Sequence, residues 1–413
     1  MKYLVLYFLC ISFFSISQTE HEIHPPDFIK TIIFKSNTNQ GELPILKFND
    51  PLTLEFDALN GDEEDFYYVI EHFDYDWNPS SLMKSEYIQG FDYQRIVSYE
   101  NSFNTYQIYS NYKLQIPNQQ TRLKVSGNYI LKIYDDYDTL MFSRKFIVYE
   151  NLANVAVAVK RSRDVSTINE KQSIDFNVNS LHLNFSNPNQ NVKALIIQNN
   201  NLSTAISDIK PLYTMGNELI YKYDTETSFW GGNEYLFFEN KDVRGANIGV
   251  QSIDLQNLYH SYLFADLNRS KHPYTYNPDI NGNFLVTVLD RDNPSIEADY
   301  TIIHFALQYP EQIDGSTIHV YGGFNNYALE PSTKMNFNQN TGLYETTLKL
   351  KQGFYNYKYV LVDEHGTLNE GAISGNYNQT ENDYKVLIYY RDLGARYDKA
   401  IGFGQVNSTN LSH

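Results

Sequence analysis

Short stretches in which apolar and polar residues alternate recur along the chain. Residues 52–56 (LTLEF) and 109–116 (YSNYKLQI) show the period of two that places successive side chains on opposite faces of a β-strand. Tight-turn signals such as the Asn60-Gly61 step separate many of these stretches. Segment 199–211 has no clear period, so its sequence is compatible with either a long loop or a short helix over a sheet edge. The pattern as a whole predicts an all-β protein.

The expected strands fall into groups that predict a tandem array of sandwiches. The first group has about the seven strands of an immunoglobulin-like sandwich and ends near residue 149. Residues 150–153 form a short linker, and a further group of strands begins at residue 299. We predict about three β-sandwich domains, each of ordinary domain size. Their expected ranges are 18–150 for an N-terminal immunoglobulin-like sandwich, 151–296 for a middle sandwich, and 297–413 for a C-terminal sandwich with a polar tail.

Composition supports this fold class and narrows the set of partners. The chain has 36 Tyr and 25 Phe residues, which favour half-buried strand positions. Its 32 basic and 49 acidic residues give a net charge of −17, so a phosphate backbone or an anionic lipid surface would repel it. The composition therefore argues against nucleic acid as a partner.

The N-terminus has the pattern of an export signal. An apolar run over residues 3–14 is too short to span a bilayer, and small residues stand just before Gln18. We predict a signal peptide over 1–17 that is cleaved after Ser17; the alternative is a lipid anchor on Cys10. Because the chain has only this one cysteine, the cleaved protein has no disulfide and depends on core burial for its stability. No later run is long and apolar enough to predict a transmembrane helix.

The sequence contains no recognisable catalytic or metal-binding constellation. Gly-x-Ser-x-Gly, Walker and Gly-x-Gly-x-x-Gly motifs are absent, and the ten histidines show no i, i+4 pairing. The acidic run 62–65 resembles calcium-binding sequence, but no ligand set is spaced around it, so a solvated loop tip explains it better. Segment 279–283 resembles the start of a calcium loop, and its Asn-Gly step fits a hairpin better. We predict that the protein is not an enzyme and has no catalytic residues, no metal site and no cofactor.

Residues 66–94 form the most informative stretch. Its first half predicts a strand with large residues on both faces, and the Asn78-Pro79 step turns the chain. Within it, IEHFDYDWNPSSLMKSEYIQGF resembles the first-domain signature of the type IX secretion system plug family. The YNPDINGNF segment further along the chain agrees with that resemblance.

The resemblance implies a function that needs no catalytic residue. Members of that family are periplasmic, and their role is to bind and occlude the periplasmic mouth of the outer-membrane type IX translocon β-barrel when it exports no cargo. The implied partner is that barrel, and the implied location is the inner face of the outer membrane.

Five residues are candidates for partner binding: Asp74, Tyr75, Asp76, Trp77 and Phe91. The first four stand where a strand gives way to a loop. Trp and Tyr are favoured interface anchors because they bury a large area at a small cost in rotamer entropy. The alternative is that Trp77 belongs to the core of the first sandwich.

The C-terminal region carries a second resemblance. VYGGFNNY, followed by GLYETTLKLKQGFYNYKYVLVD, resembles the early-set sandwich of starch- and glycogen-binding modules. Tyr327 stands where those modules have tryptophan. The resemblance implies an early-set-like domain, and it gives an alternative function as a periplasmic or surface glycan-binding protein that uses this domain. A further alternative is an adaptor for another envelope protein.

Cleavage after Ser17 can be tested by intact-mass measurement of the protein recovered from the periplasm. The mass should correspond to residues 18–413, with Gln18 cyclised to pyroglutamate. A mass increment from a diacyl lipid on Cys10 would contradict this prediction.

Overall fold

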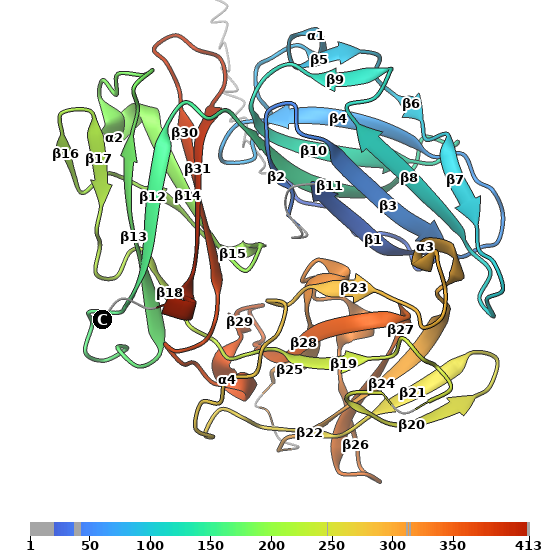
Figure 1. The fold of residues 1–413 in the computed structure, drawn as a ribbon. Coiled ribbons are helices and arrows are strands. Elements are labelled where there is room, and N and C mark those ends of the chain that lie inside the picture. Colours follow the sequence, from blue (N-terminus) through green and yellow to red (C-terminus); the bar gives the residue numbers. More distant parts are fainter. Residues whose placement is uncertain (1–19, 37–42, 246, 311–312, 314, 411–413) are drawn as a thin grey trace, which may run out of the picture.

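The computed structural model describes residues 20–36, 43–245, 247–310, 313 and 315–410. The expected signal peptide and Cys10 lie outside the described residues. Strands dominate the described residues and form several separate sheets, which confirms the all-β prediction. The larger sheets pack in pairs as three sandwiches, each around its own apolar core (Figure 1).

The first sandwich spans residues 29–149. Its elements are β1 (Ile29–Ser36), β2 (Ile45–Lys47), β3 (Leu52–Ala58), β4 (Tyr67–Phe73), α1 (Lys84–Tyr87), β5 (Ile88–Gly90), β6 (Gln94–Arg95), β7 (Ser98–Asn101), β8 (Ser110–Ile116), β9 (Thr121–Leu123), β10 (Gly127–Tyr134) and β11 (Leu140–Tyr149). One sheet has the order β1-β3-β8-β7 and the other β2-β11-β10-β4-β6, and β5 pairs with β9. Phe56, Phe66 and Phe142 form the centre of the core, where their rings pack edge to face.

The second sandwich is built from two separate parts of the chain. Its elements are β12 (Asn154–Arg161), β13 (Lys171–Asn179), α2 (Pro188–Asn191), β14 (Val192–Gln198), β15 (Asn201–Ile209), β16 (Tyr213–Met215), β17 (Glu218–Tyr221), β18 (Ser228–Trp230), β30 (Asp383–Tyr390), β31 (Lys399–Asn407) and η3 (Ser408–Asn410). One sheet has the order β12-β13-β17-β16, with β18 beside β13. The other has the order β15-β14-β30-β31, so the last two strands of the chain complete this sandwich.

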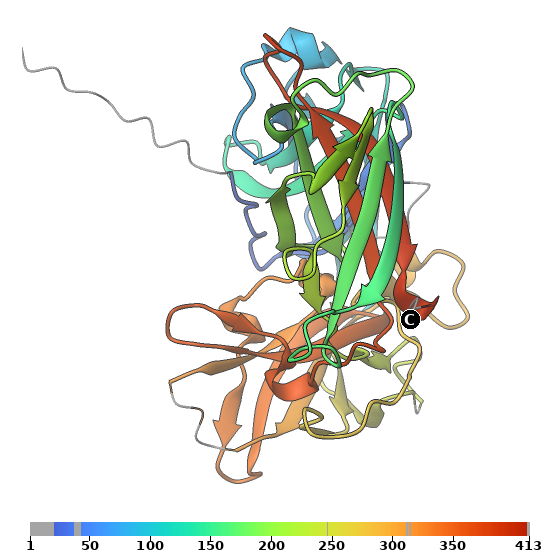
Figure 2. The ribbon, with the colours of Figure 1, turned by 90° about the vertical axis from the view of Figure 1, so that its left-hand side faces the viewer.

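The third sandwich is inserted between β18 and β30. Its elements are β19 (Leu236–Glu239), β20 (Val250–Leu255), β21 (Tyr259–Leu263), β22 (Asp266–Leu267), β23 (Phe284–Val286), α3 (Pro294–Glu297), β24 (Tyr300–Gln308), β25 (Thr317–Tyr321), η1 (Gly323–Asn325), η2 (Pro331–Thr333), β26 (Asn336–Asn338), β27 (Leu343–Lys351), β28 (Gly353–Val362), β29 (Leu368–Asn369) and α4 (Gly371–Ser374). β28 pairs with β19, β23, β25 and β29, and faces a sheet of order β20-β21-β24-β27-β26. In both views this sandwich lies at one end of the other two (Figure 2).

The strand pairing differs from the expected division into 151–296 and 297–413. β19 to β23 precede residue 297 but belong to the third sandwich, whereas β30 and β31 follow it and pair within the second. The alternation of residues identifies each strand, but it carries no information on which distant strand becomes its neighbour. The sandwiches are therefore nested along the chain rather than arranged in simple tandem order.

Segment 199–211 is neither the long loop nor the helix that its sequence left open. Most of it is β15, which pairs antiparallel with β14 through an irregular register. β15 is an edge strand in which the apolar side chains are only half-buried and Ser203, Ser207 and Asp208 are exposed. The alternation of apolar and polar residues from which a strand is predicted is therefore weak in this segment.

An apolar contact joins the outer faces of the first and second sandwiches. Ile130 on β10 and Ile147 on β11 pack with Leu195 on β14 and with Leu387 and Tyr389 on β30, and all are buried. Within β14, the neighbouring positions turn inward to the core of the second sandwich. Both faces of β14 and β30 are thus buried at this contact, which explains the continuous apolar runs 194–197 and 386–390.

A buried ion pair joins the first and third sandwiches. Lys351 Nζ lies 2.7 Å from Asp57 Oδ2, and the two side chains are 1% and 0% exposed. Asp57 also accepts hydrogen bonds from Tyr300 Oη at 2.6 Å and Asn111 Nδ2 at 2.8 Å. Burial raises the pKa of Asp57 and lowers the pKa of Lys351, while the attraction within the pair opposes both shifts. Each charge is therefore tolerated only because the other is present.

Lys351→Met should lower the free energy of unfolding by about 3–5 kcal/mol, because it leaves the Asp57 carboxyl group buried without its cation. Urea denaturation followed by circular dichroism measures the change. The control is Arg95→Met, which breaks the exposed pair between Arg95 and Asp65 and should cost about 0–1 kcal/mol. Equal losses in the two variants would contradict a special role for the buried pair.

Candidate functional site

The loop after β4 carries four of the five candidate partner-binding residues. The Trp77 amide donates to the Asp74 carbonyl at 3.0 Å, and the Asp74 amide donates to the Asn78 carbonyl at 2.9 Å. Trp77 has a φ of 62°, in the left-handed region. The side chain of Asp76 stays local, because it accepts hydrogen bonds from the Asn78 amide and side chain. These bonds close a tight turn that aims the loop toward the second sandwich.

Trp77 is buried in the apolar contact between the first and second sandwiches. It is 8% exposed and belongs to the same cluster as Phe73 and Leu387. Lys145 Nζ lies 4.4 Å from the centroid of its ring, a cation–π geometry. The structure thus places Trp77 in a core, as in the alternative interpretation, but in the core between two sandwiches rather than inside the first.

Asp74 and Tyr75 bind the second sandwich through polar contacts. Asp74 forms an ion pair with Arg391 at 2.8 Å and accepts a hydrogen bond from the Asp398 amide at 3.0 Å. The Tyr75 hydroxyl donates to Asp208 Oδ1 at 2.6 Å. Burial is the main cause of the raised pKa of both Asp74 and Tyr75. The Asp-Tyr-Asp-Trp loop therefore joins two sandwiches of the same chain.

Phe91 has a different environment from the other four candidates. It follows β5 and its side chain is 69% exposed. Its backbone is fixed, because the Phe91 amide donates to the Gln120 carbonyl at 3.0 Å. Met83 and Val97, in the same stretch of the first sandwich, are also exposed. Phe91 is thus the candidate residue whose side chain is open to a partner.

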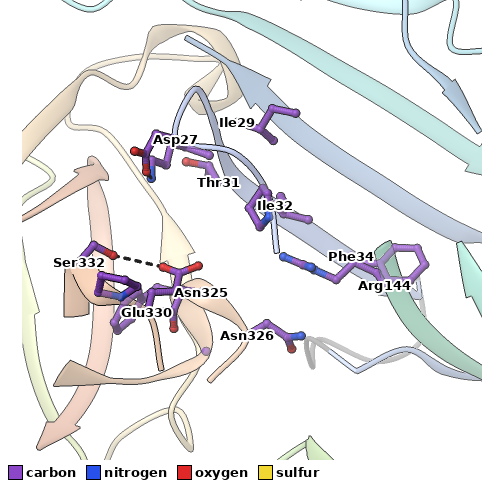
Figure 3. A pocket seen from close by; sticks show the side chains of 15 residues that line it. Asp27, Ile29, Thr31, Ile32, Phe34, Arg144, Asn325, Asn326, Glu330 and Ser332 are labelled. Carbon is purple, nitrogen blue, oxygen red and sulfur yellow. Dashed lines mark hydrogen bonds and ion pairs between the residues drawn. The ribbon is translucent and has the colours of Figure 1, made fainter. Parts of the chain in front are cut away.

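The segment that resembles glycogen-binding modules lines a hollow between the first and third sandwiches. The hollow has a volume of about 340 Å³, with β1 on one side and residues 323–332 on the other (Figure 3). Arg144 and Phe34 face it from the first sandwich, and Asn325 and Asn326 from the third.

Tyr327 itself is turned away from solvent. It is buried, and its hydroxyl donates to the Asn199 carbonyl of the second sandwich at 3.3 Å. Its ring packs against Tyr321. At the position where glycogen-binding modules have tryptophan, this protein has a contact between sandwiches instead of an exposed ring.

Two acidic segments considered as calcium sites have ordinary structural roles. Asp279 accepts hydrogen bonds from the Tyr235 and Asn281 amides, and burial raises its pKa to about 7. Residues 62–65 lie between β3 and β4. Within the described ranges, no group of three or more His, Cys, Asp and Glu side chains is arranged to hold a metal ion. No helix formed by those residues is long and apolar enough to cross a membrane.

Comparisons with known proteins identify the family. The model of the type 9 secretion system plug protein first domain matches residues 29–150, the range of the first sandwich. A hypothetical protein from Parabacteroides merdae ATCC 43184 has a crystal structure that aligns with a TM-score of 0.89 at 32% identity, covering 94% of this chain and 98% of its own. The chain belongs to the type 9 secretion system plug protein family.

Other comparisons add nothing to this assignment. An ICAM-5 D1–D4 ectodomain fragment aligns at 6% sequence identity, and the alignment covers 91% of this chain and 76% of the fragment. Dimeric latent PorU from Porphyromonas gingivalis aligns at 8% identity, and the alignment covers 92% of this chain and 34% of PorU. Both have TM-scores of 0.15, too low to support an argument. No curated protein matches the sequence.

The residues that fuse the sandwiches of this plug-family protein were not singled out from its sequence. The main examples are Leu195, Leu387 and Tyr389 in the apolar contact and the Asp57–Lys351 pair. The apolar positions had a detectable signal, because continuous apolar runs predict strands buried on both faces. Asp57 and Lys351 had none, since 294 residues separate them in the sequence.

Trp77→Ala should lower the free energy of unfolding by about 3–5 kcal/mol, because it leaves a cavity between two sandwiches. Urea denaturation and the melting temperature measure the loss. Phe91→Ala, the matched truncation of an exposed aromatic, should change stability by less than about 0.5 kcal/mol. An unchanged melt for Trp77→Ala together with lost co-purification of the translocon would instead assign Trp77 to the partner surface.

Proposed function

We propose that the protein is a non-enzymatic periplasmic plug. It seats on the periplasmic mouth of the outer-membrane type IX translocon β-barrel and occludes it while no cargo is exported. The signal peptide over 1–17 directs it to the periplasm, and the partner is the barrel itself. Membership of the plug protein family supports this role.

The fusion of the three sandwiches is the observation that carries the proposal. A stopper for a pore wide enough to pass folded cargo must be broad, and it must not deform under load. The buried contact around Trp77 links the first sandwich to the second, and the Asp57–Lys351 pair links it to the third. Close-packed interfaces of this kind resist deformation. The three sandwiches are therefore packed into one broad unit rather than joined as a flexible string of domains.

The exposed stretch around Phe91 is the docking surface that we propose. Exposed aromatic and apolar side chains are common anchors in protein interfaces. α1 and β5 lie at the end of the first sandwich that is opposite the third sandwich, so this end is free of that internal contact (Figure 1). In this proposal Asp74, Tyr75, Asp76 and Trp77 act indirectly, by holding the second sandwich in place beside the docking end.

Conductance of the purified translocon barrel in a planar lipid bilayer tests both parts of the proposal. Wild-type protein added on the periplasmic side should lower the conductance in a saturable way. Phe91→Ala should need at least about tenfold more protein for the same block, the loss expected on truncating an interface anchor.

The matched control is Leu181→Ala, which truncates a fully exposed apolar residue on the second sandwich and should block like the wild type. Unchanged conductance with saturating wild-type protein would overturn occlusion. Equal blocking by Phe91→Ala and the wild type would retain occlusion but overturn the docking surface.

A further inference from the structure

A deep cleft lies between the second and third sandwiches. Its volume is about 880 Å³, which is within the size range of small-molecule sites, and such sites concentrate between domains. β15, β18 and the loop after β18 form the wall from the second sandwich. β29, the start of α4 and the loop before them form much of the opposite wall (Figure 1).

Several aromatic side chains line this cleft. Tyr235, Tyr321 and Tyr327 line it and are buried, whereas Trp230 at the end of β18 is 50% exposed. Lys171 Nζ lies 4.4 Å from the centroid of the Trp230 ring and restrains it. A half-exposed indole offers a flat apolar face on which a ligand ring can stack. This ring comes from the second sandwich, outside the segment that resembles glycogen-binding modules.

Side-chain amides supply much of the polar lining, and neighbours hold them in place. Asn201 Nδ2 donates to the Tyr321 hydroxyl at 2.8 Å, and Gln198 Nε2 donates to the Trp230 carbonyl at 3.0 Å. Asn199 and Asn382 are joined by a hydrogen bond of 2.7 Å. Asn199, Asn201 and Asn382 are buried and use most of their donors and acceptors within the protein, so they fix the shape of the wall. Gln198 is half-buried, and the remaining groups of its amide can complement a ligand hydroxyl. Holding them in place beforehand lowers the entropic cost of binding.

Asn376 adds a hydrogen-bond acceptor that has no donor among the described residues. Its Oδ1 is buried and receives no hydrogen bond from any residue that the structure describes. Gly371 makes room for this amide, because a Cβ at that position would lie 2.1 Å from Asn376 Nδ2. A buried acceptor without a donor is unfavourable. A hydroxyl group on a bound ligand would satisfy it.

The charged residues of the cleft balance one another. Lys171 and Lys358 are matched by Glu170 and Glu370, and Lys358 pairs directly with Glu370. The lining therefore favours neither an anion nor a cation. A flat ring, fixed amides and no net charge are together suited to a ligand with many hydroxyls and apolar ring faces. We propose that the cleft binds a neutral oligosaccharide, with Trp230 stacked on a sugar ring and Asn376 Oδ1 accepting a hydrogen bond from a hydroxyl group.

Isothermal titration calorimetry of the full mature protein with chitohexaose, cellohexaose and xylohexaose tests the proposal. At least one of the three sugars should bind saturably. Trp230→Ala and Asn376→Ala should each weaken that binding at least about tenfold, as expected for the loss of an anchor residue. Because the chain has only two tryptophans, the Trp77→Phe variant leaves Trp230 as the sole tryptophan, and selectively excited tryptophan emission should change with the same sugar.

Phe264→Ala removes an exposed aromatic side chain outside the cleft and should leave the affinity unchanged. Circular dichroism of each variant verifies that it is folded. Failure of all three sugars to bind overturns the proposal, as does binding that survives both Trp230→Ala and Asn376→Ala. Binding of an extended alanine-rich peptide in place of the sugars, abolished by Trp230→Ala, overturns it in favour of a peptide site. None of these results depends on whether the protein blocks the translocon.

Discussion

The apolar contact between the outer faces of the first and second sandwiches is the interaction on which the architecture depends. β14 and β30 each present one row of side chains to the core of their own sandwich and the opposite row to the first sandwich. A strand buried on both faces cannot leave its partner without exposing one of those rows to water. Trp77 closes the edge of this contact, and the polar bonds of Asp74 and Tyr75 fix its orientation.

Nesting of the third sandwich within the second follows from the pairing of β30 with β14. The chain leaves the second sandwich after β18 and must return to place β30 beside β14. Both ends of the inserted sandwich are thereby tied to the second sandwich, and the Asp57–Lys351 pair ties it to the first. Each sandwich thus touches the other two, and the cleft lined by Trp230 lies where the second and third fail to meet fully.

The arrangement divides the aromatic residues of this plug-family protein into two classes. Trp77 and Tyr327 are buried between sandwiches, where they hold parts of the chain together. Phe91 and Trp230 are exposed, one at the docking end that we propose and the other at the rim of the cleft. Residue type alone does not separate the two classes, since large aromatic side chains stabilise cores and interfaces by the same burial of area.

The sequence by itself determined the all-β class, the positions of most strands and the resemblance of residues 66–94 to the plug family. These features are local, because alternation and turn residues act over a few positions. Only the tertiary structure decided that β30 and β31 complete the second sandwich and that Trp77 is buried between two sandwiches. It also decided that Asp57 meets Lys351. Those outcomes depend on which distant strands pair and which sheet faces meet, and the burial of a side chain is fixed by its neighbours in space.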